Sequence, residues 1–548
     1  MAYSSRSDHG LTALVALLIT MLGAALAYWV LMPTVGIDDA NITQVYGRNL
    51  AAGHGYVYNI GGERVEGSTS LIWTLINAVA FWISSTPEIG LAALSAVFAW
   101  VTLFSAMRIT RELTAESGPI PALLTGAAFL AFPAFFGWMI WSLMDVTLWV
   151  MVIAVMVWLL CRIDRAGPRG NLVLGVAVLA ALLPVTRPEG IALTMALAGF
   201  YVLRWLLFAV PGLLTGLVIG LAGVGSFAAA TAWRLSYFGY PVPNTFYAKT
   251  STDLLAQAEL GARYVLSYLQ EPQNVLLFVS FCLSGAMVLS RGGWAQRGAF
   301  WLSVYLIVGG VMVYTVLGGD HFGSHRQFLY FLPLALPIIV AGLASWVPTD
   351  RPQWQISTLL IVPFVVIALV AGTRFVQTKG NMIIEFAIAD AGRVLGDKLN
   401  ALPGTPSIGV FAAGAIRMTY DHEVLDLLGL NWTKMAHAPD DGYRSDVPNQ
   451  HGFNSNVFWE SPPDVLPIFP SDSTCPSEWV PLSGYLDAAS DQISQTERFR
   501  TTYDLFCDAG VSFYAARDYV TQSWEGDETG AFRKILPNHL EGSLPVAE

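Results

Sequence analysis

Long runs of apolar residues recur along the first two thirds of the chain, and they constrain its fold more than any other feature. The first run, Leu11 to Leu31, is about 21 residues long, which is enough for a helix to cross a bilayer. Further runs begin near residues 89, 120, 143, 171, 190, 208, 273, 298, 327 and 356. Only 13% of the residues are charged, which is about half the share in a soluble protein. We therefore predict a polytopic α-helical membrane protein with about eleven transmembrane helices.

Arginines mark alternate loops between these runs, near residues 108–111, 162–169, 204, 291–297 and 351. Loops rich in arginine and lysine stay on the cytoplasmic side of the membrane. The alternation holds only if one short apolar run, residues 70–83, does not cross, so we interpret that run as a helix at the membrane surface. The N-terminus is then inside and the C-terminus outside a bacterial inner (cytoplasmic) membrane.

The composition changes near residue 375, which divides the chain into two predicted domains. Residues 1–375 form the transmembrane domain, and residues 376–548 form an extracytoplasmic α/β domain with short strand-like runs at 406–412 and 510–515. The net charge of −11 excludes nucleic acid as a partner, because that partner requires a basic face. Cys475 and Cys507 lie in the outer domain, where we expect them to form a disulfide.

Two adjacent aspartates, Asp38 and Asp39, follow the first apolar run. Neighbouring carboxylates repel each other and are unfavourable near an anionic membrane surface unless they have a function or a cation partner. One interpretation is a general base with a partner that orients an acceptor hydroxyl. The other is a pair that caps a helix running from Ala40 to Leu50. The dipeptide alone leaves both open.

Several cationic side chains fall in the same outer loops. Lys249 is the first lysine of the chain, in an aromatic-rich loop, and an ammonium group there suits a phosphate oxygen, although an interfacial lysine is the simpler alternative. The segment 318–326 contains an arginine and two histidines, which either hold a phosphate or form a plain charged loop. Arg187 and Glu189 either belong to the site or pair to hold two helix ends together.

Taken together and in order, these segments resemble the GT-C superfamily, most of all the actinobacterial terminal β-arabinofuranosyltransferases of cell-wall arabinan and their pilin-modifying relatives. The resemblance covers most of the chain. It is carried by the Asp-Asp pair at 38–39, Asn-Leu-Ala-x-Gly-His-Gly at 49–55, Glu-Arg-Val-Glu-Gly at 63–67, Arg-Pro-Glu-Gly at 187–190, Pro-Asn-Thr-Phe-Tyr-Ala-Lys at 243–249, Gly-Gly-Asp at 318–320 and the tail segments 424–431 and 436–437.

The resemblance implies an inverting glycosyltransferase that takes a pentofuranose, D-arabinofuranose, from a polyprenyl-phosphate donor in the bilayer. The acceptor is a cell-envelope glycan or a protein on the outer face of the membrane. By analogy, Asp38 is the catalytic base with Asp39 beside it, and Lys249, Arg326 and His325 hold the donor phosphate. Supporting residues of the substrate site are implied at His54, Glu66, Asp145, Arg187, Glu189, Asn244, Tyr247, Asp320 and His321. Cations that neutralise the leaving phosphate remove the need for a metal, and we predict no metal and no cofactor.

The sequence departs from the family pattern in two places. Ser142-Leu143-Met144-Asp145-Val146 stands where Ser-Gly-x-Glu-Thr is expected, and the tail is shorter than in the arabinan enzymes. A lipid-linked sugar flippase is an alternative function, although transport sites usually lie near the middle of the membrane rather than at its surface. A GT-C enzyme with a polyprenyl-phosphate hexose is the alternative within the enzyme class, and a structural membrane scaffold is a third.

Overall fold

The computed structural model describes residues 2–114, 118–250, 253–345, 353–439, 452–468, 482, 493–508, 511–524 and 533–534. The first part is helical: α1 (Ala2–Leu31), α2 (Asp38–Ala51), α3 (Leu71–Ile83), α4 (Glu88–Leu113), α5 (Ile120–Ala128), η1 (Phe129–Ala131), α6 (Pro133–Phe136), η2 (Gly137–Trp141), α7 (Val146–Ala166), α8 (Gly170–Thr186), α9 (Gly190–Phe208), α10 (Leu213–Tyr237), α11 (Asn244–Lys249), α12 (Leu254–Gln270), α13 (Pro272–Arg291), α14 (Trp294–Val316), η3 (Gly323–Phe328), α15 (Phe331–Ala344) and α16 (Gln353–Leu399).

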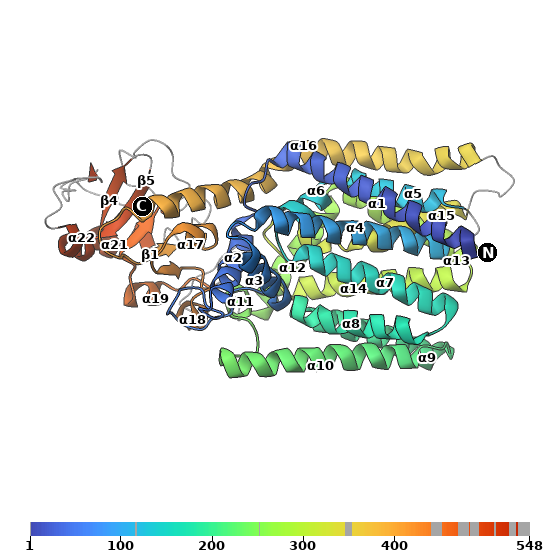
Figure 1. Cartoon of the computed structure of the whole chain (residues 1–548), viewed down its shortest axis with the longest axis horizontal. Helices are drawn as coiled ribbons and strands as arrows, with labels where there is room; N and C mark the ends of the chain where they lie inside the picture. The colour runs from blue at the N-terminus through green and yellow to red at the C-terminus, as the bar shows by residue number, and fades with distance from the viewer. Residues whose placement is uncertain are drawn as a thin grey trace.

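Long helices pack side by side in one block, and the N-terminus lies at the end of the block away from the C-terminal domain (Figure 1). Among the described residues, seven helices are long and apolar enough to cross a membrane: α1, α4, α7, α9, α10, α13 and α14. The segments Ile120–Ala131 and Pro133–Trp141 form a further candidate that is bent by 83°. Shorter apolar helices at α8, α15 and residues 364–377 of α16 coincide with the remaining spans that the sequence predicts.

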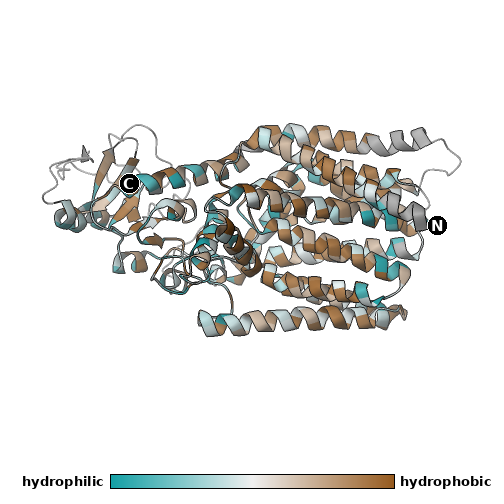
Figure 2. Ribbon diagram, in the orientation of Figure 1, coloured by the Kyte–Doolittle hydropathy of each residue, from teal (hydrophilic) through white to brown (hydrophobic). Residues whose placement is uncertain are grey.

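The residues of this block are mostly apolar (Figure 2), and many of their large apolar side chains are exposed. Leu174 and Leu221 are examples, with 65% and 74% of their surfaces exposed. A helix that is hydrophobic on every side requires an apolar surrounding, which here is the lipid of a bilayer. The structure therefore confirms the predicted polytopic α-helical membrane fold.

Helix α3 is the short apolar run that the sequence analysis places at the membrane surface. Its Trp73 and Asn77 are buried, on the side that packs on α2. Val79 and Trp82 on the other side are 57% and 80% exposed. One packed side and one apolar exposed side, with a tryptophan, are typical of a helix that lies in the membrane interface.

A labelling experiment tests the predicted topology. In a variant that lacks the exposed Cys282, Ser85→Cys should react with a membrane-impermeant maleimide in intact cells, because an α3 that does not cross leaves Ser85 outside. Ser290→Cys, at the end of α13 that the sequence predicts to be cytoplasmic, should stay unlabelled until the cells are opened. A Ser85→Cys variant that is protected in intact cells would show that α3 crosses.

Helix α16 connects the two domains without a break. Its 47 residues run from the membrane block into the C-terminal domain (Figure 1), so the boundary predicted at residue 375 falls inside a continuous helix. Beyond residue 377 the helix is more polar, which suits a segment that has left the lipid.

The C-terminal domain contains a mixed six-stranded sheet within its described residues, with the order β2-β1-β3-β5-β4-β6. Strands β1, β2 and β3 are parallel, whereas β3, β5, β4 and β6 pair antiparallel. The domain is α/β, as predicted. Its elements are β1 (Ile408–Val410), α17 (Ala415–Thr419), β2 (Val424–Asp426), α18 (Thr433–Ala436), α19 (Ser455–Glu460), β3 (Val465–Pro467), α21 (Glu497–Thr502), β4 (Tyr503–Asp508), β5 (Val511–Ala516), α22 (Arg517–Trp524) and β6 (Arg533–Lys534).

The cysteines fall into two groups. Cys161 and Cys282 are free, and Cys507 is disulfide-bonded. Cys475, the predicted partner of Cys507, lies outside the described residues, so that pairing stays a prediction.

Candidate active site

The two aspartates at the start of α2 have different surroundings. Both oxygens of Asp38 accept backbone hydrogen bonds, from Gly414 N at 3.0 Å and from Ala415 N at 2.8 Å. Asp38 is buried, and burial raises its pKa to about 6 against these two bonds. Ile37, not an aspartate, is the N-cap of α2, so the pair does not cap its own helix. Asp38 instead binds the N-terminus of α17 and connects the two domains.

Asp39 faces a polar pocket at the end of the membrane block that meets the C-terminal domain. The pocket encloses about 440 Å³ of empty space. Asp38 is not part of its wall. The wall consists of Asp39, Ile42, Thr43, Gly67, Ser68, Thr69, Ser70, Met144, Asp145, Arg187, Thr245, Lys249, Arg326 and Leu430.

Lys249 ends the short helix α11 and points at Asp39 across this pocket. Its Nζ lies 3.9 Å from Asp39 Oδ2, at the outer limit of an ion pair. Within the described part of the chain it makes no hydrogen bond. An ammonium group has three donors, so Lys249 keeps most of its capacity for a ligand.

Arginines and carboxylates form a buried network on the other side of the pocket. Arg326 Nε donates to Asp320 Oδ2 at 2.6 Å, and Gln327 Nε2 donates to the same oxygen at 2.9 Å. Arg187 Nε lies 3.3 Å from Asp145 Oδ2 and 3.1 Å from Glu189 Oε1. The network fixes both arginines against the pocket.

Asp320 and His321 of this network have pKa values that are both lowered, with opposite effects on their charge. Burial opposes ionisation of Asp320, but the Arg326 guanidinium outweighs it and holds the pKa of that carboxyl well below its usual range. The His321 ring packs on Phe322, and burial lowers its pKa, so it is neutral near pH 7.

A second buried pair holds the loop after α2 in place. Arg234, in the last turn of α10, donates to both oxygens of Glu66 at 2.8 and 3.0 Å. The two side chains are only 1% and 2% exposed. Glu66 therefore anchors the loop whose residues 67–70 line the pocket.

The C-terminal domain covers the pocket from above. Tyr46 of α2 donates to Asn431 Oδ1 at 3.0 Å, and Leu430 beside it lines the pocket. Asn244 Nδ2 donates to the carbonyl of Leu430 at 3.0 Å, and its Oδ1 lies 3.1 Å from His437 Nε2. A residue of the tail segments that carry the resemblance described above therefore forms part of the pocket wall.

Comparison with solved structures identifies this architecture. ArnT from Cupriavidus metallidurans in the apo state superimposes with a TM-score of 0.53 and 11% identity, over 84% of this chain and 91% of that one. The Archaeoglobus fulgidus oligosaccharyltransferase in the apo form gives a TM-score of 0.51 and 10% identity, over 93% and 74% of the two chains. The chain has the GT-C fold.

The sequence of this GT-C chain is also similar to a curated protein, the terminal β-(1→2)-arabinofuranosyltransferase of Mycobacterium tuberculosis. The two are 31% identical over 227 residues, which make up 39% of this chain. The match spans 34% of the relative, about a third of its length. No protein-family model matches the sequence.

The GT-C fold places some predicted residues away from the pocket. His54 is exposed on the turn after α2, outside the pocket wall. Tyr247 packs on the His437 ring at 4.0 Å, where it attaches α11 to the C-terminal domain. His325 lies against Ser267 and the rings of Tyr264 and Tyr268 in a different pocket, so the structure does not bring it to Lys249.

Two residues of the outer part of α16 belong to the surroundings of the site, and sequence reasoning missed both. Burial, together with the neighbouring Asp39 and Asp38, raises the pKa of Glu385 to about 8, so this carboxyl carries a proton near neutral pH. Arg393 donates to Asn41 Oδ1 at 2.6 Å and thereby binds α16 to α2. A prediction that α16 continues as a helix beyond the membrane would have placed Glu385 and Arg393 near the active site.

Proposed function

We propose that the chain is an inverting glycosyltransferase that moves a pentofuranose from a polyprenyl-phosphate donor to an acceptor on the outer face of the membrane. The observation that carries the proposal is the polar pocket in which the Asp39 carboxylate faces the Lys249 ammonium group at 3.9 Å. Inverting transfer needs a base on one side of the anomeric carbon and a cation beside the leaving phosphate on the other side.

Asp39 is the proposed base. Its side chain is 21% exposed, so an acceptor hydroxyl reaches it, whereas both oxygens of Asp38 are occupied by backbone donors. Asp39 takes the hydroxyl proton while the acceptor oxygen forms its bond to the anomeric carbon. The bond from that carbon to the phosphate oxygen breaks on the opposite face, so the configuration inverts.

Lys249 and Arg326 are the proposed partners of the leaving phosphate, which departs with the bonding electron pair. Among the described residues Lys249 makes only the long contact to Asp39, and Arg326 uses Nε and Nη2 on Asp320. Within the described residues Arg326 Nη1 has no hydrogen-bond partner. Cations that face the developing negative charge of a leaving phosphate stabilise it strongly.

An apolar groove in the membrane block supports a lipid-linked donor. It lies between α9 and α14, with Leu193 and Val313 among its lining residues, and encloses about 830 Å³ of empty space. The groove ends at Glu189, which pairs with Arg187 of the polar pocket. A prenyl chain in the groove would place its phosphate beside the cations of the pocket.

The named relative supports the choice of sugar. Since it is a terminal β-(1→2)-arabinofuranosyltransferase, we assign D-arabinofuranose as the transferred sugar and an extracytoplasmic acceptor.

The charge of Lys249 gives the direct test. Lys249→Ala should lower kcat/KM by about 100-fold and weaken donor binding, because it removes a cation that faces the phosphate. The assay uses purified protein, a synthetic short-chain polyprenyl-phosphoryl arabinofuranose and a soluble arabinoside acceptor. Lys434→Ala, the same change at an exposed pair with Glu460, is the control and should leave turnover intact. Lipid translocation without a new glycoside bond would instead identify a flippase.

A further inference from the structure

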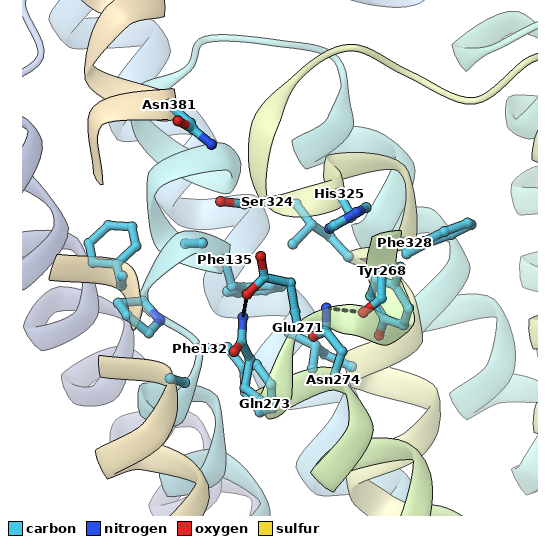
Figure 3. A pocket seen from close by; sticks show the side chains of 16 residues that line it. Phe132, Phe135, Tyr268, Glu271, Gln273, Asn274, Ser324, His325, Phe328 and Asn381 are labelled. Carbon is cyan, nitrogen blue, oxygen red and sulfur yellow. Dashed lines mark hydrogen bonds between the residues drawn. The ribbon is translucent and has the colours of Figure 1, made fainter. Parts of the chain in front are cut away.

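A second pocket lies on the other side of η3 and shares no residue with the active site. It encloses about 750 Å³ between η3, α6, the start of α13 and the outer part of α16. Figure 3 shows the aromatic residues Phe132, Phe135, Tyr268 and Phe328 around it, with polar side chains between them. Nothing in the proposed transfer reaction uses these groups.

The backbone of η3 separates the two pockets. Ser324 and His325 both have left-handed backbone conformations, with φ angles of 60° and 49°. Such conformations are costly for residues other than glycine and are concentrated at functional sites. The consequence here is that His325 faces the second pocket, whereas the next residue, Arg326, faces the active site.

Several polar groups of the second pocket have no protein partner. Ser324 and Asn381 are exposed to its space, and within the described residues their side chains make no hydrogen bond. Gln273 Oε1 is buried and also lacks a partner. A buried polar atom is normally hydrogen-bonded, so Gln273 Oε1 suits a donor of a ligand, and the Ser324 and Asn381 side chains can bond to the same ligand.

The charges of the pocket cancel. Arg374 Nη2 lies 3.2 Å from Glu271 Oε2, so the carboxylate is already paired. Burial lowers the pKa of His325 to about 4, which leaves its ring neutral. None of the described side chains that line the pocket is a free cation, so nothing among them favours a phosphate or another anion. Aromatic faces combined with uncharged hydroxyl and amide groups instead suit a sugar, whose C–H face is apolar and whose edge carries hydroxyls.

We infer that this second pocket binds an uncharged sugar residue of the acceptor glycan, next to but apart from the donor site. The acceptor role rests on the proposed function, whereas carbohydrate binding itself does not. The pocket lies at the outer ends of the helices, and η3 forms a wall of both pockets. A glycan held there would reach toward Asp39 past η3.

A pocket-filling substitution tests the inference by binding rather than by turnover. Asn381→Trp should raise the Kd of the full-length protein for a synthetic arabinofuranosyl trisaccharide at least tenfold, measured by calorimetry and saturation-transfer NMR. Val376→Trp is the matched control on the same helix, because Val376 is 55% exposed and outside the pocket wall. Asn381→Leu, which removes the amide but adds little volume, should weaken binding several-fold and covers the case in which tryptophan disturbs η3.

This experiment distinguishes failure of the proposed transferase function from failure of the proposed sugar-binding pocket. Binding of a short-chain polyprenyl phosphate should be unchanged in all three variants, which shows that the donor site is intact. Trisaccharide binding that Asn381→Trp weakens would support the pocket even if no transfer were found. An unchanged trisaccharide Kd in Asn381→Trp and Asn381→Leu would overturn the inference, even in an active enzyme, as would a wild-type protein that does not bind the trisaccharide.

Discussion

Replacing Asp39 by Asn is expected to lower the rate of sugar transfer by roughly 100- to 10,000-fold, because the amide keeps the size of the side chain but cannot accept the hydroxyl proton. Donor binding should survive, because Lys249 and Arg326 are untouched. The measurement is single-turnover transfer with purified protein, together with a separate donor-binding titration.

Asp38→Asn is the informative comparison for this prediction. An amide NH₂ cannot accept a hydrogen bond, so one of the two backbone N–H groups of α17 loses its partner. We expect lower thermal stability and turnover within about tenfold of wild type per folded molecule. Loss of transfer in Asp38→Asn with near-normal transfer in Asp39→Asn would return the role of base to Asp38, which the sequence analysis favoured.

The second large effect concerns stability. Glu66→Ala should destabilise the protein by about 3–5 kcal/mol, because it leaves the Arg234 guanidinium buried without its partner. The unfolding midpoint of the detergent-purified protein measures this loss. Turnover should fall too, since residues 67–70 line the active site.

Two further variants separate the buried pair from the loop around it. Glu63→Ala is the matched control, because Glu63 is exposed in the same loop and accepts a single bond from Thr433 N. The double variant Glu66→Leu with Arg234→Met should recover much of the lost stability, since well-packed apolar residues often replace a buried ion pair without cost. A Glu66→Ala protein as stable as Glu63→Ala would contradict the prediction.

The membrane fold was predictable because each helix that lies in lipid consists of a continuous run of apolar residues, which a short stretch of sequence shows by itself. The arginine loops and the strand-like runs near 406 and 510 likewise indicated spans and an α/β tail. The continuity of α16 was not predictable in this way. Lys379, Asn381 and Glu385 end the apolar run, and polarity alone does not distinguish a helix that leaves the membrane from a loop.

The site was predictable in its residue types and only partly in its geometry. Lys249, Arg326 and Arg187 come together from α11, η3 and the end of α8, which are far apart along the chain. The division of work between Asp38 and Asp39 depends on Gly414 and Ala415, more than 370 residues away along the chain. No local pattern at residue 38 reports such a contact. The His325 side chain points into the second pocket because Ser324 and His325 have left-handed backbone conformations. In residues other than glycine, such conformations have no sequence signature.

The unbroken helix α16 connects the position of the C-terminal domain over the active site to the tilt of a membrane helix. At 1.5 Å per residue, its 47 residues extend for about 70 Å. If a helix of that length tilts as one unit by about 1°, its far end moves by about 1.2 Å. Transmembrane helices change their tilt with bilayer thickness, and α17, which holds Asp38, packs directly on α16. We therefore expect a change in bilayer thickness to shift the C-terminal domain relative to Asp39.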